Sequence, residues 1–229
     1  MGAQSPTALG VSPTDADLAD HPGVIDLFAV LAYGEISAFY RLAEEAKLSP
    51  TLRGKVAVAK MASAEMGHFN ALEGALAARG VDIFDAMAPF VRALDAYHAS
   101  TDPSTWLESM VKFYVGDGIA ADFYNEIAGA LPPAVAEVVR DVLAETSHSE
   151  FVVEEVRRAV EASRSERDRL TLWGRRLLGE AITQAQYVMA QRDELTELVL
   201  GAAGDLNGIA SLFERMQASH AERMAKLGI

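Results

Sequence analysis

The hydrophobic and polar positions of this chain fall into long helical stretches, separated by short segments in which Gly and Pro gather. Alanine is abundant and runs of β-branched residues are short, and both features favour helix over strand. The pattern predicts six helices and one short connector helix. Their expected ranges are 22–47, 49–79, 103–130, 132–162, 165–200 and 205–226, with the short helix at 84–97.

The lengths of the connections predict how these helices pack. The first and second helices, and the third and fourth, are joined by short connections, which favour two antiparallel hairpins. The connection over residues 81–102 is long. Two helical hairpins with one long crossover make an all-α, ferritin-like four-helix bundle. We expect its core at about 22–162, with two additional helices at about 165–227 packed outside it.

Residues 1–20 are rich in Pro, Ser and Asp and contain no apolar run. We therefore expect a disordered tail and not a signal peptide, followed by one helical domain over residues 21–229. No apolar stretch is expected to be long and charge-free enough to span a membrane. The chain has no cysteine, which excludes disulfides and thiolate metal sites. Together these observations predict a cytoplasmic protein without a membrane partner.

The two predicted hairpins repeat one pattern. The first helix of each carries an acid that follows a glycine and lies fifteen residues before a proline, Glu35 in one hairpin and Asp117 in the other. The second helix of each carries Glu and His three residues apart, and such a pair projects from one face of a helix. This is the ligand set of di-iron and di-manganese carboxylate bundles. The six predicted metal ligands are Glu35, Glu65, His68, Asp117, Glu145 and His148.

Charge also favours a pair of metal ions. Four ionised carboxylates in a bundle core would be costly alone, and two divalent cations would cancel them. Oxidation of the metals would leave positive charge that oxygen-derived ligands balance, so the site suits reaction with dioxygen. The ligand types fit two iron ions and equally permit manganese or a mixed Mn/Fe centre.

Asp117 is preferred over two other acids of its helix, Asp122 and Glu126, by its position in the repeat. Asp122 lies about 140° around the helix from Asp117, so both cannot easily point inward. Gly116 and Gly118 flank Asp117, although glycine is unfavourable inside a helix. Two interpretations stay open for these glycines: relief of crowding between helices, or a cavity or π-bulge beside the metals.

Two tyrosines and one further Asp–His spacing complete the candidate chemistry. Tyr114 and Tyr124 share the face of Asp117, either as core residues with an outlet for the hydroxyl or as redox-active neighbours of the metals. Asp95 and His98 are also three residues apart, and we interpret them as a surface feature of the connector helix.

The net charge of −13 is unfavourable for binding nucleic acid. One segment, Arg157–Arg176, runs against this trend, with seven arginines against three acids for a net of +4, and it contains Trp173. It is either a helix junction with local ion pairs or a docking patch for an anionic partner.

The motifs Ala32–Glu35, Ala64–His68, Val115–Asp117 and Glu145–His148 resemble the ferritin-like superfamily, and within it the MiaE-type tRNA hydroxylases, over about residues 22–200. Members of that group are non-haem di-iron monooxygenases that hydroxylate the isopentenyl group of a modified adenosine beside the tRNA anticodon. The resemblance implies that the six ligands hold iron, that Glu65 and Glu145 bridge the two ions, and that an electron-donor protein is a partner.

By the same resemblance, tRNA would contact the Arg157–Arg176 segment. The chain departs from the group in carrying Asp117 where Glu is usual and in its acidic charge, which counts against a tRNA substrate. Two other interpretations stay open: a ferroxidase or peroxide-detoxifying protein, and a non-enzymatic metal-binding helical module. A homodimer is also left open.

Overall fold

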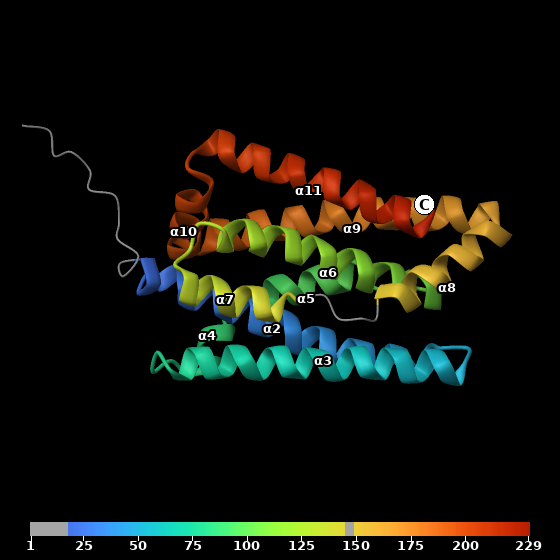
Figure 1. Cartoon of the computed structure of the whole chain (residues 1–229), viewed down its shortest axis with the longest axis horizontal. Coiled ribbons are helices and arrows are strands. Elements are labelled where there is room, and N and C mark those ends of the chain that lie inside the picture. Colours follow the sequence, from blue (N-terminus) through green and yellow to red (C-terminus); the bar gives the residue numbers. More distant parts are fainter. Residues whose placement is uncertain (1–17, 145–148) are drawn as a thin grey trace, which may run out of the picture.

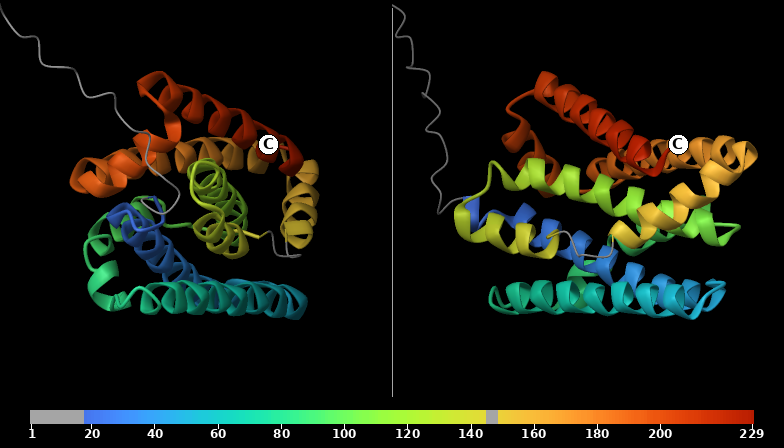
Figure 2. Two further views of the ribbon diagram at one scale, coloured as in Figure 1. Left: turned by 60° about the vertical axis from the view of Figure 1, so that its left-hand side comes forward. Right: turned by 45° about the vertical axis from the view of Figure 1, so that its right-hand side comes forward.

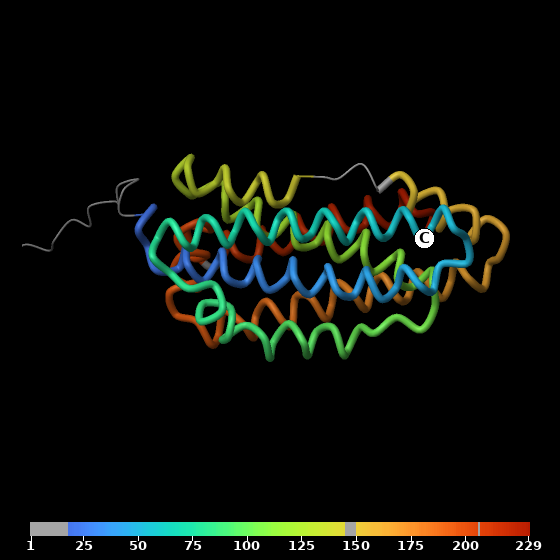
Figure 3. The backbone as a smooth tube through the Cα atoms, turned by 90° about the horizontal axis from the view of Figure 1, so that it is seen from below, coloured from blue at the N-terminus to red at the C-terminus, as the bar shows by residue number. Residues whose placement is uncertain are grey.

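The computed structural model describes residues 18–144 and 149–229, and within these ranges the chain is helical without a strand. It opens with an antiparallel hairpin of α2 (Pro22–Glu45) and α3 (Leu52–Ala77), joined by the short 3-10 helix η1 (Ala46–Leu48). Figure 3 shows the two long helices side by side. Thr51 caps α3 by accepting a hydrogen bond from the Gly54 amide at 3.0 Å.

The long crossover contains two short helices where one was expected, α4 (Ile83–Met87) and α5 (Val91–Ser100). It leads to α6 (Trp106–Ala128), which passes between the α2–α3 hairpin and the C-terminal helices (Figure 1). The predicted ferritin-like, all-α arrangement of two hairpins and a long crossover is thus present.

The fourth predicted helix, 132–162, is not continuous. It begins as α7 (Pro133–Val142), and the backbone has left the helical region by Leu143. A separate helix, α8 (Ser149–Ala162), follows the intervening residues 145–148, which lie outside the described ranges. The expectation of one helix over this whole range was therefore wrong.

The fifth predicted helix is also divided, into α9 (Arg164–Gln191) and α10 (Asp193–Ala203). The break is at Arg192, whose extended backbone has φ −134° and ψ 92°. The Arg192 guanidinium donates two hydrogen bonds, of 2.6 and 3.0 Å, to the carboxylate of Asp26, which is only 5% exposed. This pairing ties the α9–α10 junction to the first turns of α2.

The C-terminal helices were expected to pack outside the four-helix core, and the structure differs from this expectation. α9 packs along α6 and also against α5, and α11 (Leu206–Leu227) covers α6 and the outer side of α9 (Figure 2). Residues of α9 line the internal cavity described below. Helix α9 is therefore a wall of the functional core.

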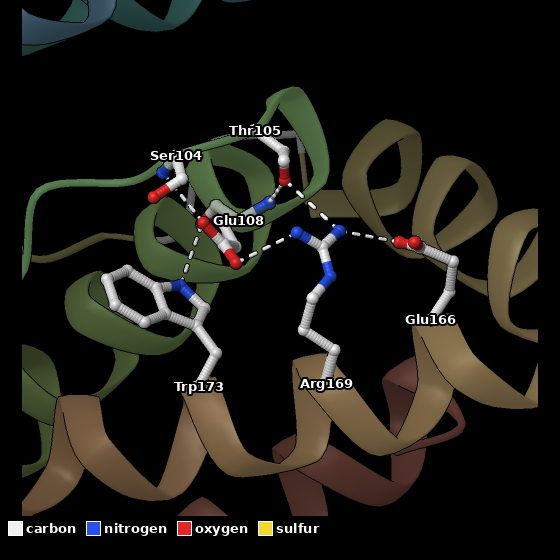
Figure 4. Close-up of polar contacts among 6 residues, drawn as sticks. All are labelled: Ser104, Thr105, Glu108, Glu166, Arg169 and Trp173. Atoms are coloured by element: carbon white, nitrogen blue, oxygen red, sulfur yellow. Dashed lines mark hydrogen bonds and ion pairs between the residues drawn. The ribbon is translucent and has the colours of Figure 1, made fainter.

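A buried polar contact fixes the start of α9 against the start of α6 (Figure 4). Thr105 caps α6, and the Glu108 carboxylate accepts hydrogen bonds from the Ser104 amide at 2.7 Å and from Arg169 at 3.0 Å. The Trp173 indole N–H donates to the Glu108 carbonyl oxygen at 3.0 Å. Because Glu108 is only 8% exposed, these charge-assisted bonds are well shielded from water.

The buried apolar side chains form two clusters, and the predicted acids lie at their boundary. One cluster contains Val24–Ala32 of α2 with the C-terminal half of α3, whereas the other contains Leu42 of α2 with the N-terminal half of α3. Glu35 and Glu65 stand between the two groups along their helices. The bundle thus has a polar layer between two apolar layers.

By length and composition alone, Pro22–Leu48 could cross a membrane. The expectation that no such stretch exists was therefore wrong, because residues 23–40 contain only two charges, Asp26 and Glu35. In the fold, 61% of the most apolar window is buried by the rest of the chain. That is typical of the core helix of a soluble bundle, and one such helix is weak evidence for a membrane span.

Candidate metal centre

Three of the six predicted ligands converge in the polar layer. Nδ1 of His68 lies 3.1 Å from Oε2 of Glu35 and 3.6 Å from Oε2 of Glu65. The side chains of the two glutamates are 12% and 9% exposed, and that of His68 is 21% exposed. One donor atom from each residue can be chosen so that all three lie within 4.8 Å of one another. The hairpin therefore brings two oxygen ligands and one nitrogen ligand to one point.

The electrostatics of this group fit a cation. Burial and the neighbouring Glu65 raise the pKa of the Glu35 carboxyl well above its ordinary value, although His68 acts in the opposite direction. The same two glutamates raise the pKa of His68 to about 10. Two buried acids therefore share one imidazolium. A divalent ion supplies more positive charge at the same place, so the donor set fits a metal such as iron or manganese.

Asp117 lies on α6 and lines the same cavity as Glu35 and Glu65, but its side chain is exposed and outside the three-residue group. The two acids that follow it on α6 form ion pairs with α11. Asp122 pairs with Arg223, and Glu126 accepts two hydrogen bonds from Arg215, at 2.7 and 2.8 Å. Asp117 therefore lines the cavity from α6, whereas Glu35 and Glu65 line it from α2 and α3.

Glu145 and His148, the remaining predicted ligands, lie outside the described residues. The flanking elements are described, with α7 ending at Val142 and α8 beginning at Ser149. The six-ligand site therefore stays a prediction, and the structure shows only that Glu35, Glu65 and His68 lie close together.

A cavity of about 270 Å³ opens directly beside these acids. It extends between α2, α5, α6 and α9, and most of its surface is apolar. Its apolar walls include Leu31, Leu94, Phe113, Phe123 and Val188. A volume of this size accommodates a small organic molecule beside the candidate ligands.

The glycines beside the predicted ligands have two different roles: some line the cavity, and one relieves crowding between helices. Gly34 and Gly116 line the cavity, and a Cβ at Gly34 would meet nothing within 4 Å. Gly118 instead faces Arg223, whose Cδ would lie 2.5 Å from a Cβ at that position. Helix α6 is regular throughout, without a π-bulge. Gly116 therefore widens the cavity, and Gly118 relieves crowding against α11.

Tyr124 lines the cavity and packs edge-on against Phe123, with ring centroids 5.3 Å apart. Burial and the charge of Glu35 raise the pKa of its hydroxyl, so Tyr124 stays protonated. Tyr114 lies in the partly buried margin of the second apolar cluster. A redox role for either tyrosine stays a prediction.

The ferritin-like domain family of actinomycetes has a sequence model that matches residues 20–202 of this chain. The chain belongs to this family. The match spans α2 to α10, so it includes the α9 wall as well as the hairpins that carry the predicted ligands. No curated protein matches the chain.

Most arginines of the Arg157–Arg176 segment contact groups of the protein itself. Arg158 pairs with Glu155 at 2.6 Å, and Arg169 pairs with Glu166 at 2.6 Å as well as with Glu108. Trp173 is 8% exposed and its N–H is bonded to α6, which leaves no open ring face for stacking on a base. Much of the segment thus serves as a junction between helices.

Sequence reasoning missed a second group of cavity residues and misplaced one of them. His98 was expected at the surface, yet it lines the cavity and its Nδ1 is buried, whereas Asp95 is exposed and accepts a hydrogen bond from Tyr33. Arg41 and Lys112 line the cavity beside His98. These residues lie on three helices without a local spacing, so the sequence held no short-range signal for them.

Proposed function

We propose that this chain is a non-haem di-iron hydroxylase that inserts an oxygen atom from dioxygen into a small, largely apolar molecule. The observation that carries the proposal is the position of Glu35 and Glu65, which contact His68 and also line a largely apolar cavity. Oxidation of iron alone needs no cavity for an organic molecule, so this feature favours a hydroxylase over a ferroxidase.

In this proposal each part of the site has one task. The pair of iron ions would be held by the six predicted ligands Glu35, Glu65, His68, Asp117, Glu145 and His148. The apolar walls bind the organic substrate and exclude bulk water, which strengthens the electrostatic interactions within the site. A bound pair of iron ions supplies dioxygen activation and C–H oxidation, which protein side chains do not provide.

The electron balance of the overall reaction shows which kind of partner the protein needs. One C–H bond, dioxygen, two electrons and two protons give one C–OH group and water. The two electrons require a reductant, so the proposal includes a reduced electron-donor protein. The tRNA substrate implied by the MiaE resemblance stays a prediction, and the ion pairs of the arginine segment reduce the cationic surface available for phosphate.

The test starts from the full chain, loaded with ferrous iron without oxygen. We expect about two irons per chain, as in other carboxylate bundles of this ligand type. Addition of a reductant and ¹⁸O-labelled dioxygen, with a panel of small apolar compounds, should place the label in a hydroxylated product detected by mass spectrometry. Iron oxidation with no label in any product would overturn the hydroxylase and favour ferroxidase chemistry.

A matched pair of variants on α3 controls this test. Glu65→Gln removes one buried carboxylate, so iron content and dioxygen consumption should both fall. Glu73→Gln changes an exposed glutamate of the same helix and should leave both unchanged. Iron binding that survives in Glu65→Gln at the wild-type level would contradict the assigned site.

A further inference from the structure

The cavity has a second polar region, which we call the basic end. It lies beyond the predicted metal site: Arg41 follows Glu35 by six residues on α2, a rise of about 9 Å, and Lys112 precedes Asp117 by five residues on α6, a rise of about 7.5 Å. All four side chains line the same cavity. The basic end consists of Arg41, His98, Lys112 and Gln184.

Several buried polar atoms at this end lack a hydrogen-bond partner among the described residues. They are Nε of Arg41, Nδ1 of His98 and Oε1 of Gln184. The three side chains come from three helices, α2, α5 and α9, and all three line the cavity. Buried donors and acceptors are nearly always paired, because an unpaired one costs free energy. Their convergence on one cavity points to a ligand that supplies the partners.

The charge of the basic end is positive. Lys112 is 8% exposed and donates a hydrogen bond of 2.8 Å to the Thr101 carbonyl oxygen. Burial and the neighbouring Arg41 lower its pKa to about 8, so it is mostly protonated at neutral pH. Burial and these two cations lower the pKa of His98 to about 3, which keeps His98 neutral. Glu45 is the acid that faces the pair from the cavity wall, and burial raises its pKa.

Two cations thus face one partly buried acid inside a chain whose net charge is −13. We propose that the basic end binds the carboxylate of an amphipathic monocarboxylic acid, whose apolar body lies along the cavity toward Glu35 and Glu65. This inference rests on the proposed function, because it names the substrate class of that site. The planar fork of an arginine matches a carboxylate, and Lys112 supplies a second positive charge beside it.

The walls between the two ends fit the apolar body. The lining contains aliphatic side chains together with small and aromatic residues, which include Ala38, Phe113, Gly116, Ala181 and Ala185. The acids at the other end would repel a carboxylate, so the charges favour one orientation over its reverse. The carbon presented to the metals is therefore remote from the carboxylate, and hydroxylation is expected there.

Calorimetry on the full, metal-free chain tests the inference with three probes that share one tail: octanoate, 1-octanol and octyl phosphate. We expect octanoate to bind once per chain and 1-octanol to bind at least about tenfold more weakly, since it lacks the charge that the two cations recognise. Equal affinity for octanoate and 1-octanol, or no binding of octanoate, would overturn the proposal. Octyl phosphate that binds as tightly as octanoate would overturn the choice of a carboxylate.

Variants locate the binding. Arg41→Gln and Lys112→Met should each weaken octanoate binding by about tenfold or more and change 1-octanol binding little. Arg53→Gln, an exposed arginine on α3, is the matched control and should bind octanoate as the wild type does. Circular dichroism checks that each variant is folded, and the three-probe comparison on the wild type decides the question if a variant is not.

The design separates this inference from the proposed function. Octanoate binding without iron-dependent product formation would leave the carboxylate site standing and reject the hydroxylase. Labelled product from other apolar compounds, with no octanoate binding, would leave the hydroxylase standing and reject the carboxylate site.

Discussion

The two ends of the cavity differ in how their polar groups are satisfied. At the acidic end, Glu35 and Glu65 have His68 between them, and the three side chains contact one another. At the basic end, Arg41 and His98 line the same space with buried nitrogen atoms that lack partners in the described part of the chain. The first group is organised by its own contacts, whereas the second is complete only with a guest molecule.

This difference has a structural origin. The acidic end is built on a helical hairpin, in which Glu65 and His68 are one turn apart and Glu35 faces them from the adjacent helix. The basic end combines α2, α5, α6 and α9, and its members are separated by up to 143 positions, from Arg41 to Gln184. Residues of one hairpin can contact one another as soon as that hairpin forms. Residues from four helices come together only when all four helices have packed.

The largest expected effect is a loss of dioxygen consumption without a loss of octanoate binding. Glu35→Gln removes a buried carboxylate of the metal site, and dioxygen consumption should fall by at least about 100-fold, since even the loss of an outer-shell partner costs 10- to 100-fold. Octanoate binding to the metal-free protein should change by less than about twofold, because Arg41 and Lys112 are untouched. Oxygen-electrode measurements and calorimetry check the two halves. A parallel loss of both properties would mean that the ends do not act independently.

A second substitution narrows the space between the ends. Ala38 lies on α2 between Glu35 and Arg41 and lines the cavity, so Ala38→Leu should fill part of the substrate path. Product formation should fall by about tenfold or more while the iron content stays at the wild-type level. Ala43→Leu, at an exposed position of the same helix, is the control. Unchanged turnover in Ala38→Leu would show that substrate does not occupy this part of the cavity.

The basic end should also respond to pH. Lys112 loses its proton near pH 8, so octanoate affinity should fall by up to about tenfold between pH 7 and pH 9. His98, whose pKa is lowered to about 3, and Tyr97, whose pKa is raised to about 12, both stay neutral over most of this range. The groups that act on Lys112 or contact it are Arg41, Glu45, Tyr97, His98 and Asp102. Titration calorimetry measures the trend, and Lys112→Met should abolish it.

The smallest expected effect concerns stability. The folded pKa of Lys112, about 8, is below its ordinary value of 10.5. Between these values the unfolded chain binds more protons, so the free energy of unfolding rises with pH and this contribution is lost as pH falls through 8. From pH 8 to 9.5 the wild type should gain about 1 kcal/mol relative to Lys112→Met. Urea unfolding of the metal-free proteins measures the difference. If the free energies of unfolding of the two proteins changed with pH in parallel, burial would not lower the pKa of Lys112.

Local signals in the sequence predicted much of the fold. Pro22 and the segment before Trp106 mark helix starts, and the six predicted helices begin within a few residues of observed ones. The break at Arg192 was not predictable, because residues 180–200 contain no Pro or Gly. The Arg192 side chain instead pairs with Asp26, 166 positions away. Long-range contacts of this kind override local helix propensity.

The candidate site likewise has one part that the sequence predicted and one part that it did not. The Glu65–His68 spacing and the repeat position of Glu35 were sufficient to predict that these residues meet. No rule of spacing connects Arg41 with His98 or Gln184, and His98 was assigned to the surface because one apolar face of a short helix does not reveal what covers it. The cavity exists because α9 joins the core, and α9 had been expected outside it.

The Arg169–Glu108 contact and the Arg192–Asp26 pair hold α9 in place near both ends. The residues that α9 turns toward the cavity are small or uncharged, and none of the six predicted ligands is on this helix. A relative could therefore exchange Ala181 or Ala185 for larger side chains and accept a different guest while its ligands stay the same. Substitutions on α9 would then be one way in which members of this family change the molecule that they bind, and redesign of the cavity can begin at these positions.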